Sequence, residues 1–191
     1  AAFTRTERGL QQTENWPVES TDSVTRATLE QGGNTLTVDV SEDADGNKTY
    51  TASDTARTET PDTAAAQAFI SSAATLYFSS SADFKPTDEA LAAYGLAEPS
   101  AALTVECTRT DDASGAQESV TSVLYLGAVD ANGDYYARLA DSNAVSTLNA
   151  TALSGVLGMT LDGMLPTEEE SAPESAPASE SGSVSAASAA D

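Results

Sequence analysis

One continuous stretch, Leu91 to Leu139, constrains the fold of this chain more than any other part of the sequence. It opens with a short apolar run that ends in Tyr94-Gly95, a pattern typical of a helix closed by a glycine in the left-handed conformation. A turn marked by proline, an alternating strand over 102–108 and a hairpin with two adjacent tyrosines follow. The stretch therefore predicts an antiparallel fold element, and it contains no recognisable reaction centre.

The segments upstream predict a hairpin and a third strand. Two β-rich runs, Val24–Glu30 and Thr35–Val40, flank a Gly-Gly-Asn turn, and apolar residues alternate with polar ones along the second run. A second turn signal at 45–47 leads into the short run Lys48–Thr51. We expect one face of this hairpin to be buried. Downstream, strands are expected over 120–126, 135–139 and 145–148.

Apolar spacing and capping signals predict two to three helices. The longest carries an apolar stripe from Phe69 to Tyr77 and is expected to end at Ser79-Ser80-Ser81. At its start, Thr60 is the expected cap residue, Pro61 suits the first helical position and Asp62 is an early acid. Thr87 is suited to cap a short second helix, and Asn149 a third. After the third helix, the segment from Met159 to Leu165 is expected to trail over the surface.

Two similar turns, Asp43–Asn47 and Asp130–Asp134, each follow a predicted strand and precede a predicted helix. The similarity predicts two hairpin-plus-helix pseudo-repeats, at about 24–80 and 100–158, which pair their sheets or pack helices on a shared face. The alternative is chance similarity between two Asx-Gly turns. In either case the predicted class is α+β, with a mainly antiparallel sheet.

Composition divides the chain into three parts. Residues 1–17 show no sustained period and are expected to form an irregular lead-in, from which Trp16 could dock on the domain. Residues 18–165 are expected to form a single α+β domain. Residues 166–191 are almost entirely Glu, Ser, Ala and Pro, and they are expected to form a disordered acidic tail because they offer too little apolar surface to offset chain entropy.

The charge of the chain excludes several classes of function. The chain has 30 acidic and 8 basic residues, no His and a net charge of −22. Nucleic acids and anionic lipid surfaces require clustered Lys and Arg, so neither is expected as a partner. Without His, no Ser-His-Asp or Cys-His mechanism is available within the chain. The acidic pairs at Asp111-Asp112 and Glu168–Glu170 lie in solvated runs, where no desolvation tunes a carboxyl for catalysis. We therefore expect a protein that is not an enzyme and has no catalytic residues.

Two groups of residues are candidates for binding. Asp130, Asn132 and Asp134 place oxygen ligands at alternating positions, as calcium loops do, although the spacing departs from an EF-hand and an ordinary hairpin turn is the alternative. Tyr136 and Arg138 fall on one face of a strand, where they could contact a ligand or pack across strands. A weak Ca²⁺ site is the one cofactor considered, and otherwise none is expected. The single cysteine, Cys107, alternates with apolar residues and is expected to be buried.

Several of these signals together resemble a bacterial family catalogued as domain of unknown function 4340. The shared pattern is a helix ending in Tyr-Gly-Leu, an acid and a proline, a strand end with glycine, Tyr-Tyr-x-Arg, and Val-x-x-Leu. Its residues here are Tyr94, Gly95, Leu96, Glu98, Pro99, Gly127, Tyr135, Tyr136, Arg138, Val145 and Leu148. The resemblance covers roughly Val24 to Leu157, with a longer and more acidic insertion at Thr110–Ser119.

The resemblance implies an envelope protein that is held by an N-terminal membrane helix or lipid, is displayed outside the cytoplasm and is in some cases encoded beside ABC-type transporter components. It implies no catalytic residues. No apolar run in the chain approaches the ~20 residues needed to cross a bilayer. The chain starts without Met, so membrane attachment is expected only through an anchor that preceded Ala1.

Two functions follow as hypotheses. The first is a non-catalytic binding or scaffold module on the outer side of a bacterial membrane, with an envelope or transporter protein as its partner. The alternative is a small-ligand or Ca²⁺ receptor that feeds a transporter through a cleft between the two units. An exposed aromatic patch would favour the first, and a concave site would favour the second.

Overall fold

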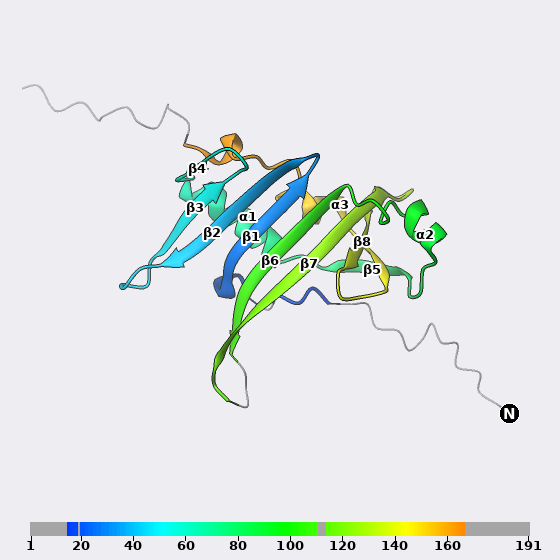
Figure 1. Ribbon diagram of the computed structural model, residues 1–191, viewed down its shortest axis with the longest axis horizontal. Helices are drawn as coiled ribbons and strands as arrows, with labels where there is room; N and C mark the ends of the chain where they lie inside the picture. Colours follow the sequence, from blue (N-terminus) through cyan, green and yellow to red (C-terminus); the bar gives the residue numbers. More distant parts are fainter. Residues whose placement is uncertain (1–14, 19, 111–113, 167–191) are drawn as a thin grey trace, which may run out of the picture.

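The computed structural model of the chain describes residues 15–18, 20–110 and 114–166 (Figure 1). Most of the predicted lead-in (1–14), the pair Asp111-Asp112 and the predicted tail from 167 onward lie outside these ranges. Trp16, however, is described. Its side chain is 8% exposed and its indole Nε1 donates a hydrogen bond to the Ala73 carbonyl oxygen at 3.0 Å, so the predicted docking of this residue is confirmed.

Within the described residues, nine strands form one antiparallel sheet in the order β4-β3-β2-β1-β6-β7-β8-β9-β5. Consecutive strands pair as hairpins except where β1 pairs with β6 at the centre and β5 joins β9 at one edge. The strands are β1 (Val24–Gln31), β2 (Asn34–Glu42), β3 (Lys48–Ser53), β4 (Thr58–Glu59), β5 (Phe78–Asp83), β6 (Ala101–Thr110), β7 (Gln117–Val129), β8 (Tyr135–Leu139) and β9 (Val145–Leu148).

The described chain also forms three α-helices, α1 (Thr63–Ala74), α2 (Asp88–Ala93) and α3 (Ala150–Leu153), and the single-turn 3₁₀ helices η2 (Thr21–Ser23) and η3 (Asp162–Met164). α1 and α3 lie behind the sheet in Figure 1, while α2 stands at its right-hand end. Every α-helix starts with a side-chain cap, from Asp62, Thr87 and Asn149 respectively. Among the described residues, no helix combines the length and apolarity needed to span a membrane. The single antiparallel sheet and the three α-helices of the described residues confirm the predicted α+β class with a mainly antiparallel sheet.

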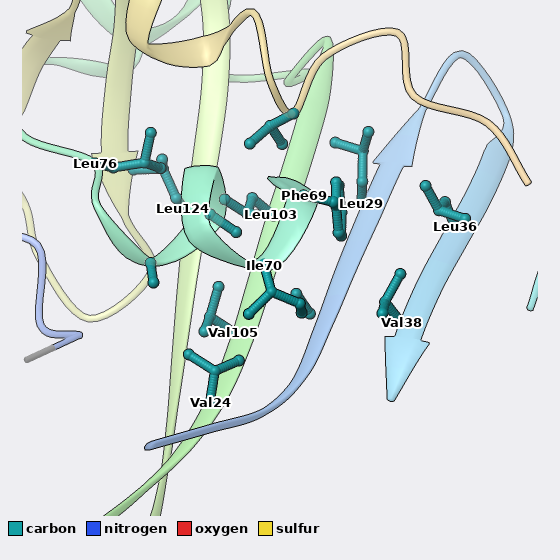
Figure 2. Close-up of a cluster of buried hydrophobic side chains, with 14 of the residues drawn as sticks. Val24, Leu29, Leu36, Val38, Phe69, Ile70, Leu76, Leu103, Val105 and Leu124 are labelled. Carbon is teal, nitrogen blue, oxygen red and sulfur yellow. The ribbon is translucent and has the colours of Figure 1, made fainter. Parts of the chain in front are cut away.

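The core lies between α1 and one face of the sheet. Phe69 is fully buried and Ile70 is 3% exposed, and both point from the helix into the apolar residues of β1 and β6 (Figure 2). On that face of the sheet, Leu103 and Val105 are fully buried. Burial of each such side chain stabilises the fold by about 1.5–3 kcal/mol. The face that contacts α1 is called the inner face below.

Two local predictions about the ends of α1 and one about the segment after the third helix were wrong. α1 ends at Ala74, well before Ser79–Ser81, because the chain leaves the helix at Thr75 and residues 78–83 pair with β9 instead. Its N-cap is Asp62 rather than Thr60, since the Asp62 carboxylate accepts a hydrogen bond from the Ala65 amide at 2.8 Å. The segment 159–165 does not trail over the surface: Leu161 is 3% exposed and Met164 is fully buried. The Asp62 amide also donates a hydrogen bond to the Met164 carbonyl oxygen at 2.7 Å, which joins this segment to the start of α1.

Candidate functional site

The second face of the sheet, called the outer face, is where the predicted binding residues lie. β6 shows the division between the faces: its side chains alternate between buried and half-buried from Ala101 to Thr108, so that Leu103 and Val105 face inward and Thr104 faces outward. On β8 the same alternation buries Ala137 and Leu139 on the inner face. Tyr136 and Arg138 therefore share the outer face, as predicted. Cys107 lies on the inner face and is 4% exposed, which confirms its predicted burial.

A Tyr-Gly-Leu turn holds α2 against the C-terminal end of β7. Gly95 has φ +70°, and Leu96, the residue after it, donates its amide to the Leu91 carbonyl oxygen at 2.8 Å. The Ala128 amide donates a hydrogen bond to the Tyr94 carbonyl oxygen at 2.8 Å. A Cβ added to Gly127 would lie 2.2 Å from that same oxygen. The turn can approach the strand this closely only because Gly127 has no side chain.

This docking brings the ring of Tyr94 against the ring of Tyr136. The ring centroids are 4.5 Å apart and the planes are tilted by 44°, a geometry in which aromatic pairs stabilise each other. Desolvation raises the pKa of Tyr94 above its ordinary value, and the negative charge of Asp83 and the neighbouring Tyr136 raise it further. Tyr94 therefore stays uncharged at neutral pH, and its ring forms one aromatic wall with the ring of Tyr136.

Arg138 lies beside this wall and has no acidic ion-pair partner among the described residues. Its guanidinium carbon sits 5.7 Å from the centroid of the Tyr125 ring, a cation–π distance. Its Nε atom is buried and makes no hydrogen bond among the described residues. By contrast, Arg26 on the same face contacts Asp39 at 2.6 Å and Glu106 at 3.5 Å. We refer to Tyr94, Tyr125, Tyr136 and Arg138 as the outer-face site.

Sequence reasoning found half of this site. Tyr136 and Arg138 could be predicted because alternation along a single strand places them on one face. Tyr125 joins them through the β7–β8 register, in which Tyr125 stands opposite Arg138. Tyr94 arrives from α2. The only advance signal for it was the Tyr-Gly-Leu turn, which indicates a helix end and does not indicate where that end docks.

The predicted metal residues form a closed hairpin turn. One carboxylate oxygen of Asp130 accepts hydrogen bonds from the amides of Asn132 at 2.7 Å and Asp134 at 3.0 Å, and the other accepts one from the Asn132 side chain at 3.2 Å. Asp134 in turn accepts a hydrogen bond from the Asn149 side chain at 3.0 Å. The backbone hydrogen bond from Asp134 lowers the pKa of Asp130, with a smaller contribution from Asn132. These bonds account for the residue types without an ion.

The turn at Asp43 has the same pattern of bonds. Its carboxylate accepts hydrogen bonds from the amides of Asp45 and Asn47, each at 2.9 Å, and the backbone hydrogen bond from Asn47 is the main cause that lowers the pKa of Asp43. No group of three or more His, Cys, Asp or Glu side chains suited to a metal ion occurs in the described part of the chain. Calcium binding at Asp130, Asn132 and Asp134 stays a prediction.

Comparison with known proteins adds one finding. No curated protein and no solved structure matches the chain. The model of the family described as Domain of unknown function (DUF4340) matches residues 60–164, which include α1 to η3 and hold the whole outer-face site. The match covers more than half of the 191 residues. The chain therefore belongs to the DUF4340 family, as its Tyr-Gly-Leu and Tyr-Tyr-x-Arg motifs predicted.

Proposed function

We propose that the chain is a non-catalytic binding module of a bacterial envelope protein and that it holds a partner protein at the outer-face site. The observation that carries this proposal is Arg138, whose guanidinium is half-buried against Tyr125 without a carboxylate within ion-pair distance among the described residues. An unpaired cation that has lost part of its hydration is costly to a fold. A carboxylate from a partner would offset that cost.

The composition of the site supports recognition of a protein. Tyr and Arg are enriched among the residues that dominate binding energy at interfaces, because they combine large contact area with directed hydrogen bonds. Here Arg138 contacts the ring of Tyr125 and shares its face of β8 with Tyr136, and the Tyr94–Tyr136 contact limits the movement of those two rings. A rigid aromatic site loses little side-chain entropy on binding.

The setting of the module rests on the family resemblance. We propose placement on the outer side of a bacterial membrane, with a transporter component or another envelope protein as the partner. The net charge of −22 disfavours a partner that is acidic overall.

We also propose that the module consists of two hairpin-plus-helix pseudo-repeats. Two features support this: β3-β2-β1 and β8-β7-β6 follow one another in mirrored order about the β1–β6 contact, and the turns at Asp43 and Asp130 share one pattern of hydrogen bonds. In this arrangement Tyr125, Tyr136 and Arg138 belong to the second repeat, and Tyr94 comes from the segment between the two repeats.

Site-specific photo-crosslinking in the producing bacterium tests the binding function. A benzophenone amino acid placed at position 136 is expected to give a discrete adduct with one envelope protein, identified by mass spectrometry, and Arg138→Gln is expected to abolish that adduct. The control position is Tyr77, which is 62% exposed and lies outside the site. Identical adducts from positions 77 and 136, or an adduct that persists in R138Q, would contradict the proposal.

A further inference from the structure

The outer-face site is one end of a longer row of residues that crosses the sheet. Strand registers place Glu30 opposite Ala102, Ala102 opposite Tyr125, and Tyr125 opposite Arg138. All four residues lie on the outer face, because each follows directly after a residue that is buried on the inner one: Leu29, Ala101, Leu124 and Ala137. With strands about 4.8 Å apart, three strand spacings separate Glu30 from Arg138 by roughly 14 Å.

The middle of this row is hollowed. A cavity of about 400 Å³ lies between the β1–β2 turn and Pro99, with Ala102 and Tyr125 among its lining residues. Ala102 is too small to fill the space beside the Tyr125 ring. The hollow therefore offers a place for one apolar or aromatic side chain, which would stack on Tyr125.

The two ends of the row carry opposite charges. Like Arg138, Glu30 has no ion-pair partner among residues that the structure describes, although it also lines the hollow. Elsewhere on the outer face the charges are matched internally, as in the contacts of Arg26 with Asp39 and Glu106. The row thus presents an acid, a hollow and a base in line, and neither charge is neutralised.

We propose that this row binds an extended peptide segment of the partner protein with an acidic residue, an apolar or aromatic residue two positions away, and a basic residue two positions further. In an extended chain, side chains at i, i+2 and i+4 share one face, and four residues span roughly 13 Å, which matches the length of the row. The acid meets Arg138, the apolar side chain enters the hollow, and the base meets Glu30. This inference rests on the proposed function, since both use Arg138.

The geometry favours side-chain recognition across the strands over addition of a strand to the sheet. β1, β6, β7 and β8 are interior strands, so their backbone groups are already paired. The peptide can run in either direction, because the pattern is read from the side chains. Swapping the acid and the base is therefore no control, whereas changing their spacing is one.

Fluorescence anisotropy with the full chain and synthetic peptides tests the inference. The probe is a labelled, end-blocked nonapeptide, Gly-Ser-Asp-Ser-Phe-Ser-Lys-Ser-Gly, and the matched control moves Lys one position closer to Phe, which turns it to the opposite face. The probe is expected to bind at least about tenfold more tightly than the control at low salt. Arg138→Gln and Glu30→Gln are each expected to weaken probe binding about tenfold, and Glu118→Gln to leave it unchanged. Thermal unfolding verifies that each variant is folded.

The outcomes separate this inference from the proposed function. Absence of probe binding at millimolar peptide, equal binding of probe and control, or insensitivity to both substitutions would overturn the peptide pattern. If the adduct from position 136 still forms and depends on Arg138, the binding module stands and its partner is recognised by other chemistry. If the probe binds as expected while no adduct forms, the row recognises the peptide pattern and the envelope setting is wrong.

Discussion

Gly127 shows how a single missing side chain positions the outer-face site. Its φ lies outside the left-handed region, so the position does not need glycine for its backbone conformation. What matters is space, because a Cβ there would approach the Tyr94 carbonyl oxygen to 2.2 Å and the Leu96 side chain to 3.0 Å. Gly95 contributes from the other side, since its own Cβ would lie 2.7 Å from the Ala128 amide nitrogen. Two glycines therefore let the end of α2 rest on β7 and bring Tyr94 to Tyr136.

Gly127→Ala is expected to destabilise the fold by about 1–3 kcal/mol, since the added methyl group must displace backbone rather than a flexible side chain. The displacement should also move Tyr94 into water and lower its pKa towards the ordinary value of 10.0. Urea unfolding and an alkaline absorbance titration measure the two effects. Gly163→Ala is the matched control, because the nearest atom to its added Cβ would lie at 3.4 Å. Equal stability of the G127A and G163A variants would show that the α2 turn is not held by this contact.

At the scale of elements, the turns that join β2 to β3 and β7 to β8 depend on one carboxylate each. Asp43 and Asp130 accept amide hydrogen bonds that close the turns, and these bonds lower the pKa of both side chains. A carboxylate with a lowered folded-state pKa contributes fully to stability above its unfolded pKa. That contribution is lost as the pH falls through the folded-state value.

Asp130→Ala is expected to destabilise the protein at pH 7, because two turn amides lose their acceptor. Asp130→Asn keeps an acceptor oxygen and should cost less. The difference in unfolding free energy between wild type and either variant should shrink as the pH falls below 3.8, the ordinary pKa of an Asp carboxyl group. Denaturant unfolding from pH 7 to pH 2 measures these differences, with Asp45→Asn as the control because its carboxylate closes no turn. A difference between wild type and D130N that is independent of pH would refute the role of the Asp130 charge.

At the scale of the whole molecule, the predictable parts are those with strong local patterns. Strands 135–139 and 145–148 were predicted to the residue, and the Asn132-Gly133 turn marks the start of the first of them. β5 was missed because Phe-Ser-Ser-Ser-Ala-Asp has little strand character of its own and extends an apolar helical stripe. Its partner is β9, nearly seventy residues away in the sequence, so only the assembled sheet makes it a strand. Met164 was wrongly predicted to lie on the surface for the same reason, since its contacts are also with segments distant in the sequence.

The outer-face site was also predictable only where a local pattern places its residues. Two of its residues share one strand, and alternation brings them together. The other two depend on the register between β7 and β8 and on the docking of α2, which form only when distant segments meet. Tertiary contacts therefore decide which surface residues become neighbours, and no local spacing in the sequence records them.

The family match begins at residue 60, yet the sheet does not. β1 pairs with β6 along Val24–Gln31, and the first three strands contribute Leu29, Leu36 and Val38 to the core beneath α1. Each of these side chains contributes about 1.5–3 kcal/mol, so losing the whole group approaches the 5–15 kcal/mol that stabilises a domain. Without β1, the long strand β6 would also become an exposed apolar edge.

A fragment of residues 60–166 is therefore expected to lack cooperative unfolding and to bind a hydrophobic dye, whereas the full chain unfolds in one transition. Circular dichroism during thermal unfolding, dye fluorescence and amide hydrogen exchange measure the contrast. Adding residues 15–59 as a separate peptide is expected to restore protection of the β6 amides, because β1 supplies their hydrogen-bond partners. A fragment that unfolds cooperatively with protected β6 amides would mean that the matched segment carries its own core, and that the first three strands are an addition to the fold rather than half of it.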